Sequence, residues 1–147
     1  MSGDDVRSVI AGVVHDIDAK RWRELRARFA AEVDTDYTSL FGGEPVRQAG
    51  DALIAGWRSV LAGVATQHLL GPIEVHVVGE RATAECHVRA LHHVAGAPGG
   101  ELWEVLGHYR FELARERAGW AIARMALDTL VQTGNRQLLA EAAARSR

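Results

Sequence analysis

Hydrophobic residues near the start of the chain recur at helical spacing. The apolar stripe of a first amphipathic helix consists of Val6, Val9, Ile10, Val13, Val14 and Ile17. Trp22, Leu25 and Phe29 continue the spacing after a break, which predicts a second, short helix. A third helix is predicted after the start signals Gly50 and Asp51, with the apolar positions Leu53, Ile54, Trp57, Val60 and Leu61.

Elsewhere apolar and polar residues alternate, which is the period of a β-strand. A short strand is predicted from Glu32 to Leu40, ended by the pair Gly42-Gly43. From Thr66 onward the alternation continues, and it predicts a meander of four strands. Their apolar positions run from Ile73 to Val77, Ala82 to Ala90, Trp103 to Leu113, and onward from Trp120. Leu138 and Leu139 with the Ala-rich tail predict a closing helix.

This order of elements defines the expected fold class. Helices gathered first and consecutive strands afterwards predict an α+β fold, with helices on one face of an antiparallel sheet. At 147 residues the chain, 1–147, is expected to form a single domain. Ala82, Ala84 and Ala90 share one face of a long strand, and their small side chains leave room for a cavity between sheet and helices.

Composition narrows the function classes. The chain is 48% hydrophobic and 24% charged, and no run approaches the ~18 apolar residues of a membrane helix. No secretory signal is recognisable before Asp5, so a soluble cytoplasmic protein is expected. The net charge is -2 and basic residues cluster only from Lys20 to Arg28, which we interpret as a solvated helix face. Neither nucleic acid nor a membrane is therefore an expected partner.

The sequence offers little for a metal or a cofactor. Cys86 is the one cysteine, so no disulfide and no thiolate zinc site can be built within the chain. His92 and His93 with His68 would supply three imidazoles, but adjacent strand residues point to opposite faces of a sheet. We expect neither a metal nor an organic cofactor.

Asp18 and His68 are the candidates for chemistry. Asp18 follows the apolar stripe of the first helix at a corner, and His68 opens the first long strand. If the two meet, the carboxylate would fix the tautomer of the imidazole and raise its basicity, which makes a general base. The alternative is that Asp18 caps the second helix and His68 satisfies a backbone group.

Several short segments together resemble a known family. They are Ile17 to Trp22, Val33 to Ser39, Thr66 to His68, Gly107 to Tyr109, and Gly119 with Trp120. In these the chain, from about Val6 to Val131, resembles the SnoaL-like superfamily, which has the cone fold of nuclear transport factor 2. Within it the likeness is greatest to scytalone dehydratase. The resemblance implies a cone-shaped, curved mixed or antiparallel sheet wrapped around three N-terminal helices, in the order α-α-β-α-β-β-β-β followed by a C-terminal helix.

The resemblance also implies roles for single residues. Asp18 and His68 fall where scytalone dehydratase has its catalytic carboxylate and histidine base, and the pair resembles the dyad of hexachlorocyclohexane dehydrochlorinase. Tyr37 falls where the dehydratase has a tyrosine that polarises the substrate carbonyl through water. His92, or else His93, falls at a second pocket histidine. His92 is favoured because it shares strand parity with the face of Ala84, Cys86, Val88 and Ala90 that we expect to point inward.

The departures from the dehydratase pattern make the expected pocket more apolar. Ile17 stands in place of a tyrosine, and Gly107 and Tyr109 stand in place of a serine and an asparagine. The substrate is therefore not expected to be scytalone itself. The residues expected to line the substrate pocket are Ile17, Trp57, Cys86, Val88, Trp103, Gly107 and Tyr109.

Together these observations favour a cofactor-independent lyase or isomerase, dehydratase-like or cyclase-like. It would act on a small enolisable aromatic or polyketide-type carbonyl compound. His68 would remove a proton, Asp18 would orient it, Tyr37 would bind the enolate, and His92 would assist departure of a hydroxyl group. Two alternatives stay open: a non-catalytic domain that binds a small apolar ligand, and a domain whose sheet face serves only assembly. Relatives are commonly dimers or trimers, so a homo-oligomer is expected.

Overall fold

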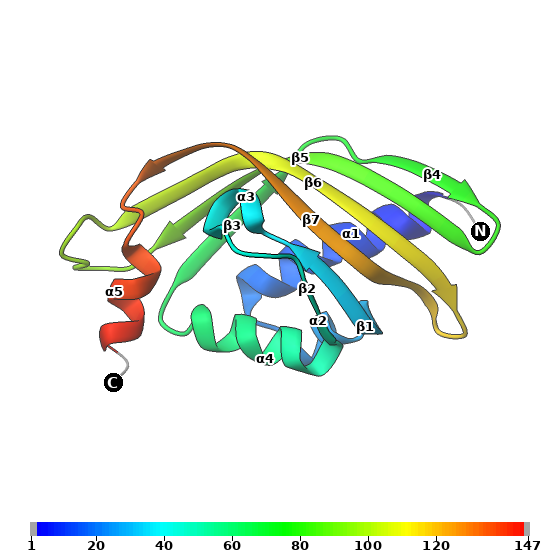
Figure 1. The fold of residues 1–147 in the computed structure, drawn as a ribbon, viewed down its shortest axis with the longest axis horizontal. Helices are drawn as coiled ribbons and strands as arrows, with labels where there is room; N and C mark the ends of the chain where they lie inside the picture. Colours follow the sequence, from blue (N-terminus) through cyan, green and yellow to red (C-terminus); the bar gives the residue numbers. More distant parts are fainter. Residues whose placement is uncertain (1–2, 146–147) are drawn as a thin grey trace.

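A curved seven-stranded sheet forms one layer of the molecule, and helices cover its concave side (Figure 1). The structure, a computed structural model, describes residues 3–145. The strands are β1 (Phe29–Asp36), β2 (Val46–Ala49), β3 (Ala65–Leu70), β4 (Glu74–Val78), β5 (Arg81–His93), β6 (Leu102–Glu116) and β7 (Gly119–Gly134). Their order is β2-β1-β7-β6-β5-β3, and β4 also pairs with β5. β1 runs parallel to β7 and every other pair is antiparallel, so the predicted α+β class with a mixed sheet is confirmed.

The long strands β5 and β6 bury alternate residues, as their sequence pattern predicts. Ala84 and Cys86 on β5, with Tyr109 on β6, are at most 4% exposed, which confirms the predicted inward face. His76 on β4 and His87 on β5 are exposed. The register between β6 and β7 shifts twice, between Leu106 and Gly107 and between Glu112 and Leu113. Bulges of this kind bend a strand, and these lie in the longest strand pair of the curved sheet.

Five helices accompany the sheet: α1 (Gly3–Ala19), α2 (Trp22–Arg26), α3 (Thr38–Phe41), α4 (Gly50–Val60) and α5 (Leu138–Arg145). The predicted stripe of α1 forms part of the core, where Val6, Ile10 and Val13 are fully buried. Figure 1 shows α1 and α4 on the same side of the arched sheet. No helix within residues 3–145 is long and apolar enough to cross a membrane.

Two ion pairs to a buried carboxylate join the end of α1 to the segment that follows it. The Asp16 carboxylate is 1% exposed and accepts hydrogen bonds from Arg21 at 2.9 Å and Arg28 at 2.6 Å. The Arg28 guanidinium passes over Gly12, where an added Cβ would lie 2.0 Å from it. The run from Lys20 to Arg28 is therefore more than a solvated helix face, because two of its arginines hold the chain against α1.

The structure corrects three element boundaries and adds one strand. Phe29, predicted in the second helix, begins β1 and is buried. The strand predicted to reach Leu40 ends at Asp36, and α3 follows it. β2 was not predicted. The run from Thr66 to Val77 divides into β3 and β4, because the regular pairing with β5 stops after Gly71, where Pro72 follows, and resumes at Glu74.

Candidate active site

Asp18 in the last turn of α1 and His68 on β3 are in direct contact. The Nδ1 atom of His68 lies 2.7 Å from Oδ1 of Asp18. The backbone N–H of His68 donates to Oδ2 of the same carboxylate at 2.8 Å, and the Thr66 hydroxyl donates to Oδ1 at 2.8 Å. The His68 side chain is 8% exposed and that of Asp18 is 23% exposed. The carboxylate thus binds both the ring and the backbone of the histidine, which fixes the ring's position.

These hydrogen bonds decide the charge of Asp18 and the tautomer of His68. Burial by itself raises the pKa of Asp18, but the hydrogen bonds from His68 and Thr66 outweigh it, so that pKa is lowered. An ionised carboxylate only accepts hydrogen bonds, so Nδ1 of His68 carries the proton. Nε2 of His68 then has a free lone pair, which is the form that a general base needs.

His92 on β5 lies close to His68 but is held in a different way. The two rings are 6.2 Å apart and nearly perpendicular. His92 is buried, stacks on Trp103 at 4.5 Å, and its Nδ1–H donates to the Trp103 carbonyl at 3.2 Å. Burial, together with the electrostatic effect of nearby His68, lowers the pKa of His92 to about 4. His92 is therefore neutral at pH 7, with Nε2 as a hydrogen-bond acceptor.

Two tyrosines stand between the histidines and β1. The Tyr37 hydroxyl donates to Sδ of Met125 at 3.7 Å, and the side chain of Tyr109 interacts with that of Tyr37. Burial raises the pKa of both phenols, so both keep their protons at neutral pH. A thioether is a weak acceptor, so the proton of Tyr37 is available to a stronger one.

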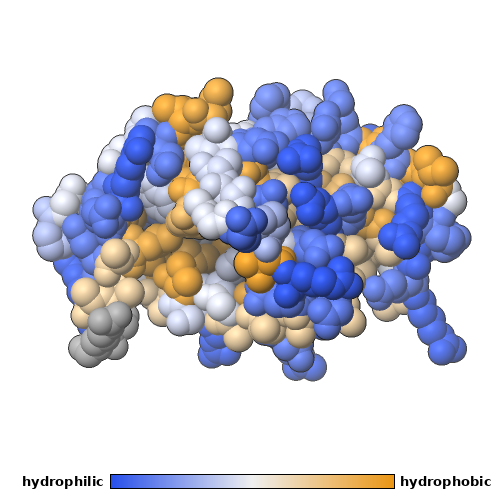
Figure 2. All heavy atoms as spheres, in the orientation of Figure 1, coloured by the Kyte–Doolittle hydropathy of each residue, from blue (hydrophilic) through white to orange (hydrophobic). Residues whose placement is uncertain are grey.

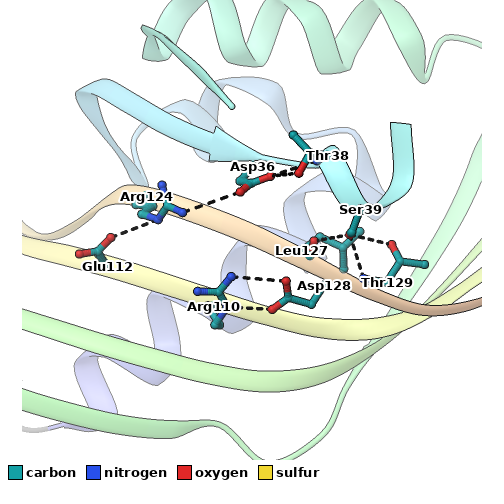
Figure 3. A network of polar contacts seen from close by, with 9 residues as sticks. All are labelled: Asp36, Thr38, Ser39, Arg110, Glu112, Arg124, Leu127, Asp128 and Thr129. Carbon is teal, nitrogen blue, oxygen red and sulfur yellow. Dashed lines mark hydrogen bonds and ion pairs between the residues drawn. The ribbon is translucent and has the colours of Figure 1, made fainter. Parts of the chain in front are cut away.

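Polar contacts on the outer side of the sheet fix the segment that carries Tyr37 (Figure 3). The Asp36 carboxylate accepts from the backbone N–H of Thr38 at 3.0 Å and from its hydroxyl at 2.7 Å. This local bond diverts the chain from strand to helix directly after Asp36. Ser39 then ties α3 to β7 by donating to the Leu127 carbonyl at 2.6 Å. The side chain of Tyr37 is thereby held at a fixed place over the sheet.

A cavity of about 350 Å³ lies between the sheet, α3 and α4, with His68 and His92 in its wall. Its surface is mostly apolar, and hydroxyl, amide and imidazole groups reach it from Thr35, Tyr37, Gln48, His68, His92 and Tyr109. Among residues 3–145, no Lys, Arg, Asp or Glu lines it. Figure 2 shows apolar surface gathered between α5, α3 and α4. Concave, mainly apolar sites of this size with a few polar groups are typical of small-molecule binding.

The structure brings most of the predicted pocket residues to this cavity. Its lining includes Ile17, Tyr37, Trp57, His68, Val88, His92, Trp103 and Tyr109. Asp18 does not line the cavity itself; its carboxylate is hydrogen-bonded to His68, which does. His93 faces away from the cavity and pairs with Glu101 at 3.3 Å.

Two of the predicted lining residues do not reach the cavity. Cys86 pairs in register with Tyr109 and is buried, and this burial raises the pKa of its thiol to about 11. Gly107 has no side chain, and its α-carbon faces the backbone of Asp128 at a bulge. Both belong to the core of the sheet.

The sequence did not identify the wall formed by β2 and α3. Phe41, Val46 and Gln48 line the cavity there, and the first two are exposed at its rim. β2 is short and carries no alternating pattern, so no periodic signal marked it.

Residues 3–145 contain no group of three or more His, Cys, Asp or Glu side chains placed to hold a metal ion. His68 and His92 are turned toward other partners: Asp18 holds Nδ1 of one ring and the Trp103 carbonyl holds Nδ1 of the other. Two imidazoles and two phenols are among the polar groups of the cavity wall.

The chain resembles solved structures over almost its whole length. The Kfla4162 protein from Kribbella flavida is 26% identical, with a TM-score of 0.87 over 93% of this chain and 95% of that one. A protein from Novosphingobium aromaticivorans, provisionally named scytalone dehydratase, is 17% identical, with a TM-score of 0.78 over 90% and 86%. A hexachlorocyclohexane dehydrochlorinase is 12% identical, with a TM-score of 0.75 over 90% and 87%. A comparison with curated proteins finds no match.

A curved open sheet, helices on its concave side and a mainly apolar cavity between them define a protein of the NTF2-like class with a cystatin-like fold. The model of the SnoaL-like domain matches residues 2–126. The chain belongs to the SnoaL-like family.

Proposed function

We propose that the chain is a cofactor-independent lyase or isomerase that removes a proton next to the carbonyl group of a small enolisable compound. The observation that carries this proposal is the Asp18–His68 hydrogen bond, with the histidine ring in the wall of an apolar cavity. Aromatic or polyketide-type ketones suit the apolar walls and the ring faces of Trp57 and Trp103.

In the proposed first step, Nε2 of His68 takes a proton from the carbon beside the carbonyl. The electron pair of that C–H bond forms a carbon–carbon double bond, and the carbonyl electrons move to its oxygen, giving an enolate. The imidazolium formed on His68 is stabilised by the Asp18 carboxylate, which already accepts from Nδ1. The hydrogen bond to Asp18 would thus hold His68 in position before the substrate binds.

The enolate oxygen would accept a hydrogen bond from Tyr37. Its present acceptor, the sulfur of Met125, is weaker than an enolate, so the exchange of partners is favourable. Tyr109, whose side chain interacts with that of Tyr37, would strengthen Tyr37 as a donor by donating to its hydroxyl. This role extends the sequence-based hypothesis for Tyr37, because the second tyrosine acts through the first.

Because His92 is neutral, its proposed role in the departure of the hydroxyl group is to accept a hydrogen bond. With Nδ1–H committed to the Trp103 carbonyl, His92 accepts a hydrogen bond through Nε2 and has no proton to give at pH 7. In a dehydration, the enolate would re-form the carbonyl, its carbon–carbon electron pair would form a new double bond toward the carbon that bears the hydroxyl, and that C–O bond would break. His68 would return the abstracted proton to the departing hydroxyl, so that water leaves. His92 would orient that hydroxyl by accepting its O–H.

The comparisons support a lyase-type role. Two structures with this fold carry the names of enzymes that eliminate a small molecule, a scytalone dehydratase and a hexachlorocyclohexane dehydrochlorinase. The alternative is a non-catalytic binding domain, and the predominance of apolar wall favours it. The two alternatives differ in whether His68 changes turnover or affinity.

The test is deuterium exchange into an enolisable ketone in D₂O, followed by NMR. The first probe is 4-phenylcyclohexanone, and a panel of enolisable carbonyl compounds is ranked beforehand by thermal shift. We expect the protein to accelerate exchange beside the carbonyl, and His68→Ala to reduce the acceleration by roughly 10²–10⁴-fold with affinity nearly unchanged. His93→Ala, on the outer face, is the matched control and should retain the rate. Tight binding without exchange, with an effect of His68→Ala on affinity alone, would instead establish a binding domain.

We further propose that residues 1–147 act as one domain in the cytoplasm and associate as a dimer or trimer. Leu69, Leu130 and Val131 are large apolar residues that remain exposed at 54%, 82% and 44%, which supports self-association. Light scattering after size-exclusion chromatography tests the oligomeric state, and a monomer at micromolar concentration would contradict it.

A further inference from the structure

The polar groups of the cavity fall into two sets that come from opposite edges of the sheet. His68 and His92 belong to β3 and β5, at one end of the strand order. Thr35 and Gln48 belong to β1 and β2, at the other end. The curvature of the sheet makes both sets part of one cavity wall. A molecule that fills the cavity therefore meets polar groups in two separate places.

Thr35 and Gln48 are close enough to act on one ligand group. In the β1–β2 register Thr35 lies opposite Val46 and Gln48 lies opposite Val33. The two residues are thus diagonal neighbours on one face of the pair, within reach of each other's side chains. Both side chains line the cavity, and Thr35 is only 7% exposed.

Neither side chain is used by the fold. Of the hydrogen bonds formed within residues 3–145, none involves the hydroxyl of Thr35 or the amide of Gln48. Within residues 3–145, Nε1 of Trp120 is the one side-chain polar atom that is both buried and without a hydrogen-bond partner, and Trp120 does not line the cavity. The Thr35 oxygen therefore reaches the cavity surface rather than being sealed in the core. Polar groups placed in this way are satisfied when a ligand or water occupies the cavity.

We propose that Thr35 and Gln48 form a second polar subsite, which binds a neutral hydroxyl or carbonyl group at the far end of the substrate. The inference rests on the proposed function, since His68 marks the end at which the reacting carbonyl lies. A carboxylate or phosphate does not suit the subsite, because no Lys or Arg of residues 3–145 lines the cavity. The substrate class is thus an uncharged molecule with an enolisable carbonyl, an apolar body and a second polar group.

The subsite would confer specificity by a known physical effect. A ligand without the second polar group covers Thr35 and Gln48 with apolar surface and leaves both unpaired. A site that hydrogen-bonds a substrate hydroxyl rejects the analogue that lacks it far more strongly than an apolar site rejects an added methylene. Gln48 is half-buried, so water can partly replace the ligand there, and the preference is expected to be moderate.

Two ketones that differ by one hydroxyl group test the inference. They are 4-(4-hydroxyphenyl)cyclohexanone and 4-phenylcyclohexanone, and their affinities are measured by isothermal titration calorimetry. We expect the hydroxylated ketone to bind about tenfold to a hundredfold more tightly. Gln48→Met and Thr35→Val, which keep the side-chain shape, should each reduce that ratio severalfold or more and leave the affinity for 4-phenylcyclohexanone equal or higher.

Control variants separate the subsite from general effects on folding. Thr35→Ser keeps the hydroxyl and should keep the preference. Gln67→Met and Thr83→Val make the same chemical changes at exposed positions of β3 and β5 and should not alter the ratio. Thermal unfolding of each variant shows that it is folded.

The outcomes are distinguishable from those of the proposed function. An unchanged ratio in both Gln48→Met and Thr35→Val, or no measurable binding of either ketone at millimolar concentration, overturns the subsite. If deuterium exchange requires His68 but the ratio of the two ketone affinities does not depend on Gln48 or Thr35, only this inference fails. If the ratio depends on Gln48 and Thr35 but His68→Ala leaves exchange unchanged, only the proposed catalysis fails.

Discussion

His68 donates from Nδ1 to a carboxylate oxygen of Asp18 at 2.7 Å, although the two residues are 50 positions apart in the sequence. The same carboxylate holds the backbone N–H of His68, so β3 and the last turn of α1 are joined by two bonds at one residue. A change at Asp18 therefore affects the orientation of His68 as well as its basicity.

The first prediction concerns Asp18→Asn. An amide does not stabilise an imidazolium, and its NH₂ group favours the tautomer with the proton on Nε2, where His68 no longer accepts a proton. We expect deuterium exchange to fall about tenfold or more, less than for His68→Ala, with ligand affinity nearly unchanged. Asp51→Asn, at an exposed carboxylate on α4, is the control. Equal exchange rates in both variants would remove Asp18 from the mechanism.

The second prediction concerns acid sensitivity from His92. Its pKa is about 4 in the folded protein and near 6.5 in the unfolded chain, so the unfolded chain binds the extra proton between these values. Stability from this group is therefore present above pH 6.5 and is lost as the pH falls toward 4. The loss between pH 7 and pH 4.5 amounts to about 2 kcal/mol.

Urea unfolding at the two pH values measures this loss. His92→Asn keeps a donor near the position of Nδ1 but does not titrate, so the pH dependence of its unfolding free energy should be smaller by about that amount. His87→Asn, at an exposed position of β5, should behave like the wild-type protein. A wild-type pH dependence in His92→Asn would show that His92 is not buried as a neutral ring.

Much of the sheet could be predicted because its residues follow one periodic rule. From Ala82 to His92 every second residue is buried, and the sequence alternates in the same register. That parity correctly placed His92 inward and His93 outward. Periodicity reports which face of an element is buried, so it succeeds wherever one face packs on a core.

The parts that could not be predicted depend on contacts between distant segments. The strand ends at Asp36 because the Asp36 carboxylate accepts a hydrogen bond from the backbone N–H of Thr38. The alternating pattern of the sequence runs on to Leu40 and does not reveal this bond. Gly107 shares the parity of the pocket face, but a bulge against Asp128 excludes it from the cavity. Gln48 is on the edge strand β2, which pairs with β1 in the sheet of residues 3–145, so its place in the site depends on tertiary structure.

The third prediction concerns the buried ion pairs of Asp16. Replacing Asp16 by Asn leaves Arg28, partly buried over Gly12, without a counter-charge. Arg28 and Arg21 are 30% and 51% exposed, so solvent screens part of the effect, and we expect a loss of about 2 kcal/mol in unfolding free energy. Asp34→Asn, which breaks the exposed pair with Arg47, should cost less than about 1 kcal/mol. Similar losses in the two variants would mean that Asp16 is solvated.

The last prediction contrasts two glycines: Gly107, which the sequence predicted in the pocket, and Gly56, which lines the cavity in the structure. A Cβ at Gly107 would lie 2.5 Å from the Asp128 carbonyl oxygen and 3.1 Å from Cδ1 of Leu127. The oxygen belongs to the backbone of β7 beside a bulge, so the neighbour cannot move aside without displacing the sheet. A Cβ at Gly56 in α4 would meet no atom within 4 Å, although this glycine lines the cavity.

Gly107→Ala should therefore lower the unfolding free energy by roughly 1–3 kcal/mol, the cost of overpacking, and should leave the relative affinities of the two ketones unchanged. Gly56→Ala should raise stability by about 0.5–1 kcal/mol, because alanine loses less backbone entropy in a helix. Its methyl group projects toward open space at the cavity wall, so it should also alter the affinity for 4-phenylcyclohexanone. Urea unfolding and calorimetry on the same two variants measure both effects. If Gly107→Ala changed the ketone preference while keeping full stability, then Gly107 would belong to the pocket, as the sequence predicted.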